Sequence, residues 1–187
     1  MILGKVDGKV LRFATQEDLS YIDQITIICY RPIHESWVSY QGADIAEGLS
    51  APGVSWEERK TKQNHDLFAE HPDWLWVLEE NNTPIGFVSF VMLPDRKLGI
   101  IENNGVLPSH AGKGLGKFMY RHVLQYMRKN GMRFAFLETG MDDAHIPARK
   151  AYEAVGFDRK FPNMYYWQNL EENKPESFPN HESDSEA

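Results

Sequence analysis

Apolar runs separated by turn-forming residues predict a chain that is rich in short strands. Two of these runs flank Asn81-Asn82-Thr83-Pro84, which has the composition of a turn, so they predict a hairpin. Pro94-Asp95-Arg96-Lys97 predicts a second turn. The predicted strands are Val10–Ala14, Trp74–Leu78, Ile85–Met92, Leu98–Val106, Phe134–Glu138, Phe157–Phe161 and Met164–Gln168.

Helical spacing of apolar residues predicts helices between these strands. The pattern is clearest after Gly112, where apolar side chains recur at i, i+3, i+4 and i+7. Polar residues that suit an N-cap precede two earlier helical segments. The predicted helices begin after Thr15, after Ser55 (to about Glu70), at Gly112 (to about Asn130) and at Pro147 (to Val155).

The order of these elements predicts an α/β fold with a mixed sheet and helices on both faces. The long helix joins the strand at 98–106 to the strand at 134–138. These two strands should therefore be parallel, through a right-handed crossover. The stretch Arg31–Ser55 contains several glycines and prolines, and we expect it to be a loop.

Length and charge indicate one domain with an acidic tail. The chain has 187 residues and a net charge of -7, and residues 171–187 hold six acids and one base, or -5 of that total. We expect residues 1–170 to form a single domain and 171–187 to be disordered. The body, at about -2 by the same count, has no basic stripe for a nucleic acid. No apolar run reaches the roughly 18 residues that span a bilayer.

Cysteine usage indicates a reducing compartment. Cys29 is the single cysteine and lies within an apolar run, so it is expected to be a small buried hydrophobic residue. One cysteine excludes an internal disulfide and a Cys-rich metal site, and we expect no metal. Because the N-terminus has no apolar signal region, we expect a cytoplasmic protein.

The most informative stretch runs from Val106 to Lys117, where a predicted strand ends in a glycine-rich turn that opens into a helix. Helix N-termini leave backbone N–H groups unpaired and carry partial positive charge, so they bind anions. The glycines stand at 112, 114 and 116, which fits neither the Walker A spacing nor G-x-G-x-x-G. The turn therefore predicts an anion site of another kind.

This stretch resembles the CoA-pyrophosphate motif of the GNAT superfamily, in which Val-x-Pro precedes Arg/Gln-x-x-Gly-x-Gly/Ala. Val106, Pro108, Gly114 and Gly116 match, whereas Ala111 stands where the family usually has Arg or Gln. A second segment resembles the family's Asn-x-x-Ala-x-x-x-Tyr-Glu-x-x-Gly-Phe. Its matching residues are Ala148, Tyr152, Glu153, Gly156 and Phe157, and His145 replaces the usual Asn.

The resemblance covers about residues 10–170 and implies the GNAT fold: a mostly antiparallel sheet in which the parallel strands at 98–106 and 134–138 splay apart. The pantetheine arm would insert between them, and Gly105 suits a β-bulge that opens the gap. The implied ligand is acetyl-CoA. Its expected binding residues are Asn104, Val106, Leu107, Pro108, Ala111, Gly112, Lys113, Gly114, Leu115, Gly116, Lys117, His145, Ala148 and Tyr152.

The resemblance also implies an N-acetyltransferase that works by direct attack of an amine. Tyr152 corresponds to the general acid that protonates the CoA thiolate; packing on pantetheine is the alternative. Glu102 is the candidate general base through a water, and Glu138 is the second candidate. His145 would contact the cofactor or cap a helix, and His110 is expected to be an exposed turn residue.

The acceptor is the least determined part. Trp37, Tyr40 and Trp56 offer aromatic faces, and the neighbouring acids offer negative charge, a mixture that suits a cationic amine. A small-molecule amine is the first choice, and a protein N-terminus or lysine is the second. A CoA-binding module without turnover, or a site for another phosphate ligand, stays open, as does a homodimer. The acids are Glu35, Asp44, Glu47, Glu57 and Glu58.

Overall fold

The computed structural model describes residues 1–49 and 52–171. Within these residues six strands form one sheet in the order β1-β2-β3-β4-β5-β6. The strands are β1 (Ile2–Val6), β2 (Lys9–Phe13), β3 (Leu75–Glu80), β4 (Thr83–Leu93), β5 (Leu98–Val106) and β6 (Phe134–Phe136). The α-helices are α1 (Leu19–Gln41), α2 (Ala43–Gly48), α3 (Trp56–Glu70), α4 (Leu115–Lys129) and α5 (Ile146–Glu153).

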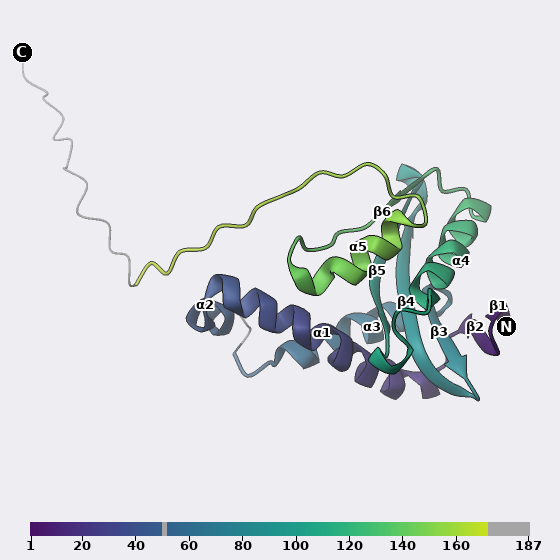
Figure 1. Ribbon diagram of the computed structural model, residues 1–187, viewed down its shortest axis with the longest axis horizontal. Coiled ribbons are helices and arrows are strands. Elements are labelled where there is room, and N and C mark those ends of the chain that lie inside the picture. The colour runs from purple at the N-terminus through teal and green to yellow at the C-terminus, as the bar shows by residue number, and fades with distance from the viewer. Residues whose placement is uncertain (50–51, 172–187) are drawn as a thin grey trace, which may run out of the picture.

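Strand pairing confirms the predicted mixed sheet. Neighbouring strands from β1 to β5 are antiparallel, and β5 pairs with β6 in parallel. Alternate side chains along β3 enter two separate cores, because successive residues of a strand point to opposite faces. Leu75 and Val77 pack in the core that includes α1, whereas Trp76 and Leu78 pack in the core that includes α4 and Tyr152 of α5. Figure 1 shows α1 to α3 on one side of the sheet and α4 and α5 on the other.

The two parallel strands separate soon after they meet, as the resemblance implied. Pairing of β5 with β6 covers only Leu98–Ile100 against Phe134–Phe136. From Ile101 onward, β5 has no strand partner on that side within the described residues. In the part of the chain that the structure describes, the edge of β5 over 101–106 therefore has no strand beside it on the β6 side, which is the gap that a false strand would fill.

A β-bulge lies beside this gap, two residues earlier than expected. Val88 pairs with Asn104 and Phe90 with Ile101, so Ser89 alone faces two residues of β5. The buried Ser89 hydroxyl accepts a hydrogen bond from the Asn103 N–H at 2.9 Å and donates one to the Asn103 carbonyl at 3.1 Å. Gly105 is paired regularly instead, and a Cβ there would lie 2.9 Å from the Cys29 sulfur. The missing side chain at Gly105 therefore allows α1 to pack closely on β5, and Gly105 does not form the bulge.

The predicted loop over Arg31–Ser55 is wrong for most of its length. Helix α1 continues to Gln41 with Pro32 inside it, and α2 follows directly. Gly42, with a φ of 87°, ends α1 as a left-handed glycine can. A proline inside a helix removes one hydrogen bond, but α1 packs along α3, β4 and β5, and this packing outweighs the local preference.

Strand β1 was missed, although its turn carries a recognisable signal. Asp7 and Gly8 have φ values of 46° and 77°, the conformation of a two-residue hairpin turn with Asp-Gly at its centre. The strand is short and half exposed, so its apolar pattern is weak. Strand β1 lies at the edge of the sheet, beside β2.

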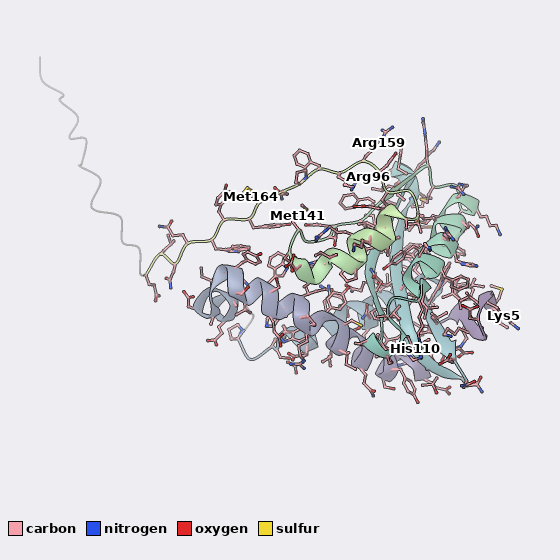
Figure 2. All side chains as sticks on the ribbon, viewed as in Figure 1. Lys5, Arg96, His110, Met141, Arg159 and Met164 are labelled. Atoms are coloured by element: carbon pink, nitrogen blue, oxygen red, sulfur yellow. The ribbon has the colours of Figure 1, made fainter. Side chains whose placement is uncertain are left out.

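The predicted strand pair over Phe157–Phe161 and Met164–Gln168 is also wrong. Residues 157–169 carry no regular secondary structure and cross from α5 towards α2, with Arg159 and Met164 on the outside (Figures 1 and 2). Side-chain contacts with α1 replace strand pairing here, since Trp37 packs against Tyr165 and Trp167 at 5.5 and 5.8 Å between ring centroids.

Two predictions concern the ends and the environment of the chain. The acidic tail predicted over 171–187 lies, except for Glu171, outside the described residues. Among the helices that the structure describes, none is both long enough and apolar enough to cross a bilayer. In the same part of the chain, no three His, Cys, Asp or Glu side chains gather as metal ligands would.

Candidate active site

A cavity of about 1300 Å³ passes through the sheet where β5 and β6 separate. Its walls come from α1, α3, β5, the loop before α4, α5 and the segment after α5. Most of the predicted site residues line it, and only Leu107, Pro108 and Lys113 do not. Those that do are Glu102, Asn104, Val106, Ala111, Gly112, Gly114, Leu115, Gly116, Lys117, His145, Ala148 and Tyr152.

The glycine-rich turn presents an open N-terminus of α4 to this cavity. Gly112 and Gly114 both have a φ of 75°, which L side chains rarely adopt. A Cβ at Gly112 would meet no atom within 4 Å, and one at Gly114 only the far end of Lys117 at 3.9 Å. No side chain caps the helix, and its first backbone hydrogen bond runs from Phe118 to Gly114. The N–H groups of Leu115, Gly116 and Lys117, in the first turn of α4, are thus free to bind an anion such as a pyrophosphate.

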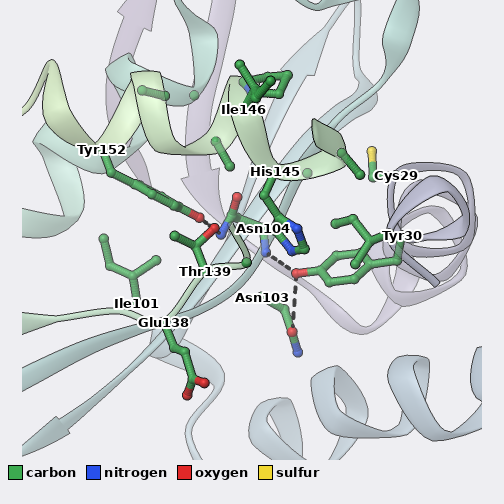
Figure 3. A pocket seen from close by; sticks show the side chains of 18 of the residues that line it. Cys29, Tyr30, Ile101, Asn103, Asn104, Glu138, Thr139, His145, Ile146 and Tyr152 are labelled. Carbon is green, nitrogen blue, oxygen red and sulfur yellow. Dashed lines mark hydrogen bonds between the residues drawn. The ribbon is translucent and has the colours of Figure 1, made fainter. Parts of the chain in front are cut away.

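Tyr152 lies buried at the centre of the cavity and is held by Asn104. The Asn104 side-chain amide donates a hydrogen bond to the Tyr152 hydroxyl at 3.1 Å (Figure 3). The Asn104 side-chain carbonyl accepts one from the Tyr120 hydroxyl at 2.6 Å. The two tyrosine rings lie 5.0 Å apart. Because Tyr152 accepts from Asn104, its own proton stays available to a group in the cavity.

Burial sets the protonation state of Tyr152. Desolvation raises the pKa of its phenol, and the neighbouring Asn104 and Tyr120 side chains oppose this only in part. A phenol with a raised pKa is fully protonated at neutral pH. The side chain is therefore protonated and able to donate a hydrogen bond at neutral pH.

A network of Asn103, Asn104 and Tyr30 of α1 joins the bulge to the wall of the cavity, and no local sequence signal predicts it. The Tyr30 hydroxyl accepts from the Asn104 N–H at 3.2 Å and donates to the Asn103 side chain at 3.3 Å. Burial raises the pKa of Tyr30 far above its ordinary value. Asn103 in turn donates to the buried Asn64 of α3, at 3.2 Å. These bonds fix the bulged backbone beside the gap.

Thr139 provides an unpaired group beside this network. Its hydroxyl oxygen is buried without a hydrogen-bond partner among the described residues, and the residue lines the cavity close to Asn104 (Figure 3). An unpaired buried hydroxyl is costly, so it indicates a place that a bound molecule completes. Thr139 follows β6, which puts it on the far side of the gap from β5.

The two candidate bases are accessible carboxylates on the cavity wall. Glu102 is exposed and lines the cavity from the bulge. Glu138 also lines it and points away from Asn104 (Figure 3), and its carboxylate accepts a hydrogen bond from the Tyr165 hydroxyl at 2.5 Å. That hydrogen bond is the main reason that the pKa of Tyr165 is raised.

The acids proposed for the acceptor do not reach the cavity. Trp37 and Trp56 line it, but Tyr40 is 73% exposed and does not. None of Glu35, Asp44, Glu47, Glu57 and Glu58 is part of the wall, and Glu58 instead completes the capping box of α3 with Ser55. Two bases of α3, Arg59 and Lys60, occupy this part of the wall.

Residues 35–157 match the Acetyltransferase (GNAT) family, which is well over half of the chain. This protein belongs to the GNAT family. Its likeness to a mycothiol acetyltransferase of Thermomonospora curvata is 27% identity over 146 residues, covering 77% of this chain and 48% of the relative. With a streptothricin acetyltransferase of Streptomyces lavendulae it shares 37% identity over 57 residues, or 30% and 29% of the two chains. The chain thus spans about half, or less, of the length of these curated relatives.

Solved structures of GNAT proteins share the fold. A family member from Brucella melitensis in complex with acetyl-CoA has a TM-score of 0.56 at 19% identity, covering 84% of this chain and 91% of its own. The ribosomal-protein-S18-alanine N-acetyltransferase of Escherichia coli gives 0.56 at 17% identity, with 82% and 79% covered. The sheet that separates between β5 and β6 is therefore a GNAT sheet.

His145 is one of two departures from the GNAT motifs, and the structure gives it a partner. It stands at the N-cap of α5 but makes no capping hydrogen bond with its side chain. Its Nδ1 instead bonds the Asp142 carboxylate, which also accepts from the Ser36 hydroxyl at 2.7 Å. Burial acts to raise the pKa of Asp142, but these two hydrogen bonds outweigh it and the pKa is lowered. The ring is thereby fixed on the cavity wall.

Other polar residues near the GNAT motifs have structural partners. The Arg149 guanidinium donates to the carbonyls of Gly140 and Asp142, at 2.6 and 2.8 Å, and so shapes the loop before α5. His110, expected to be exposed, is half buried and contacts the Glu80 carboxylate at 3.0 Å. That contact ties the glycine-rich turn to β3. Lys150, by contrast, lines the cavity.

Proposed function

We propose that this chain transfers the acetyl group of acetyl-CoA to a primary amine, most simply a small molecule, by direct attack. The observation that carries the proposal is the position of Tyr152. It is a buried, protonated phenol in a cavity that joins the free N-terminus of α4 to the gap between β5 and β6. An acyl-CoA whose phosphates bind at the N-terminus of α4 would place its thioester sulfur in the gap between β5 and β6.

Binding rests on backbone groups. The N–H groups of the glycine-rich turn and Lys117 suit the pyrophosphate, because both supply positive charge at close range. From Ile101 onward β5 has no strand partner on the β6 side within the described residues, and this open edge suits the amide groups of pantetheine, as a strand partner would. The buried, unpaired Thr139 hydroxyl suits a polar atom of the thioester end.

The chemistry needs one proton removed and one supplied. The amine nitrogen attacks the thioester carbon, the C–S bond breaks, and the acetyl amide forms. The Tyr152 phenol gives its proton to the departing thiolate, and the ammonium proton passes through water to Glu102. Tyr152 then recovers a proton from solvent and Glu102 releases one to solvent, so the cycle balances.

The aromatic part of the cavity wall, beside α1, favours a small acceptor over a protein chain. Trp37, Tyr165 and Trp167 pack together there, with ring centroids 5.5 to 5.9 Å apart, and all three line the wall. Names of GNAT relatives do not separate the classes, since they include acceptors as different as mycothiol and a ribosomal protein. A protein N-terminus or lysine is the second candidate.

Thermal unfolding with ligands tests the proposal. The protein would be heated with acetyl-CoA, CoA, ATP or NAD, since a ligand at 100 times its dissociation constant adds about 2.7 kcal/mol to the stability. We expect a rise in Tm with the two CoA species only. A panel of amines, read by release of the CoA thiol, then tests turnover.

Each result has a distinct meaning. Stabilisation by ATP or NAD in place of CoA would contradict the proposal. Stabilisation by CoA without thiol release from any amine, small or peptide, would leave a CoA-binding module. Thiol release with peptides alone would move the acceptor to the second candidate.

A further inference from the structure

Two cations on α3, Arg59 and Lys60, face the cavity without acidic partners of their own. Both line its wall, and neither forms an ion pair within residues 1–49 and 52–171. Elsewhere on and beside this helix the bases are paired: Lys62 with Asp66 at 2.5 Å, and Arg31 with Glu57 at 3.6 Å. Unpaired cations are thus confined to the side of α3 that faces the cavity.

Lys60 is partly withdrawn from water. Its ammonium lies 4.5 Å from the centre of the Tyr30 ring, and Tyr30 also bonds the backbone of Asn104. Burial lowers the pKa of Lys60, and the charge of Glu102 opposes this shift. The charge of Glu102 thus acts on Lys60 without forming an ion pair, and Arg59, which is exposed and lines the cavity, has no ion-pair partner among the described residues.

The phosphates of a bound CoA do not explain why Arg59 and Lys60 lie on the cavity wall. Helix α4, whose N-terminus suits the pyrophosphate, packs on the face of the sheet that holds Trp76 and Leu78. Helix α3 packs on the other face, where its Phe68 contacts the core formed with α1. The sheet lies between the two sites, so the cations of α3 are on the side from which the acceptor would enter.

We propose that the acceptor is an amine that also carries a carboxylate, which binds Arg59 and Lys60 while its amino group faces Glu102 and Glu138. This rests on the acetyl transfer proposed above and names its substrate class. Two carboxylates share the wall with these cations: Glu102, whose charge acts on Lys60, and Glu138, which bonds Tyr165 beside Trp37 of α1. A zwitterion complements both pairs, because each charge that is removed from water gains an opposite charge.

The aromatic wall describes the rest of the acceptor. His34 stacks on Trp56 at 4.8 Å between ring centroids, and both line the cavity near Arg59. Trp37 continues this surface towards Tyr165 and Trp167. Such a wall suits an apolar or aromatic group between, or beside, the two charged ends. Amino acids with apolar side chains have this combination.

Matched amines isolate the carboxylate. Each set contains an amino acid, its carboxamide and the amine without the carboxyl group, such as L-phenylalanine, L-phenylalaninamide and 2-phenylethylamine. Sets with the carboxylate on the α, β and ω carbons cover the distance between the two charges. We expect kcat/KM for the best carboxylated member to exceed that of its partners by about 10–100-fold, the value of a charge-assisted hydrogen bond. Rates across a range of pH separate this from differences in amine basicity.

Variants locate the effect on α3. Arg59→Gln and Lys60→Gln should reduce the preference for the carboxylated member towards one, and Arg59→Lys should keep part of it. Lys62→Gln removes the same charge from the same helix but away from the cavity, so it should leave the preference intact.

Three results would overturn the inference. They are equal or faster turnover of the carboxyl-free amines, a preference that survives both substitutions, and a preference that Lys62→Gln also removes. If no amine is acetylated, the Tm of the CoA complex provides a second test. A larger rise in Tm with the amino acids than with their amides would support the inference, and equal rises would contradict it. Failure of acetyl transfer itself is seen separately, as absence of thiol release from every amine.

Discussion

The two halves of the cavity are built in different ways. The half on the α4 side comes from two continuous stretches, the glycine-rich turn and α5, and much of its binding capacity lies in backbone N–H groups. The half on the α3 side is assembled from side chains of α1, α3, β5 and the segment after α5, which lie far apart in the sequence. CoA is common to GNAT enzymes, so backbone N–H groups can recognise it in all of them. An acceptor that differs from one enzyme to the next must be recognised by side chains.

The bulged part of β5 is where the two halves meet. Asn104 holds Tyr152 of α5, on one face of the sheet, with its side chain. Its backbone N–H, and the side chain of Asn103, bond Tyr30 of α1 on the other face. A shift of this short stretch would displace Tyr152 and Tyr30 together. Tyr152, the proposed proton donor, is therefore the most direct probe of whether the halves act as one site.

Replacing Tyr152 with Phe should have the largest effect. We expect kcat to fall about 100-fold, the loss of one general acid, while the affinity for acetyl-CoA changes little because the ring still packs. In the proposed mechanism the phenol must be protonated, so we expect activity to be lost as pH rises through the pKa of Tyr152, which burial raises above the ordinary value of roughly 10. Tyr152→Phe should lack this alkaline loss. The measurement is kcat against pH.

Tyr21→Phe is the matched control, because Tyr21 is exposed on α1 and does not line the cavity. It should behave as the unmodified protein. Near-normal turnover by Tyr152→Phe, with the alkaline loss retained, would show that this ring only packs on pantetheine.

The glycine-rich turn permits a test with an internal reference. Gly114 and Gly8 have φ values of 75° and 77°, and a Cβ at either would meet no close atom. Alanine should strain the backbone equally, by roughly 1–2 kcal/mol. Only Gly114→Ala should also weaken CoA binding, by about 10-fold, because it displaces N–H groups at the N-terminus of α4.

Titration calorimetry with CoA and thermal unfolding separate these two consequences. Similar falls in Tm with a loss of affinity in Gly114→Ala alone would support the anion site. Equal CoA affinity in the two variants would mean that this turn is merely a tight connection, and the backbone account of the α4 half would be lost.

Sequence reasoning recovered the α4 half because its signals are local. Glycines at 112, 114 and 116 between a strand and an amphipathic helix predict an open helix N-terminus, and β5 was placed with its observed bounds. The parallel pairing of β5 with β6 followed from the helix that joins them. Each inference needed only neighbouring residues and the chirality of the crossover.

The α3 half escaped prediction because its contacts are long-range. Arg59 and Lys60 look like an ordinary helix surface until packing turns that surface to the cavity. Pro32 suggested a break, yet packing of α1 keeps the helix intact. Composition drew attention to acids such as Glu57 and Glu58, but an ion pair with Arg31 and the capping box of α3 occupy these two.

Ala111 gives the smallest and most discriminating test of the α4 half. The family usually has Arg or Gln here, and Ala111 is exposed on the cavity wall beside Gly112. Ala111→Arg should tighten CoA binding by up to about fivefold, since an exposed ion pair adds roughly 0.2–1 kcal/mol. The gain should shrink as salt is raised, because exposed charges are screened.

Ala69→Arg adds the same charge at an exposed position of α3 outside the cavity, so it measures any effect of net charge alone. A gain at position 111 that exceeds the gain at 69 and falls with salt would show a cation beside the bound phosphates. Equal gains at both positions would reduce the effect to net charge. No gain at either would mean that the backbone N–H groups and Lys117 already satisfy the phosphates, so the departure from the family motif at Ala111 costs this protein nothing in affinity.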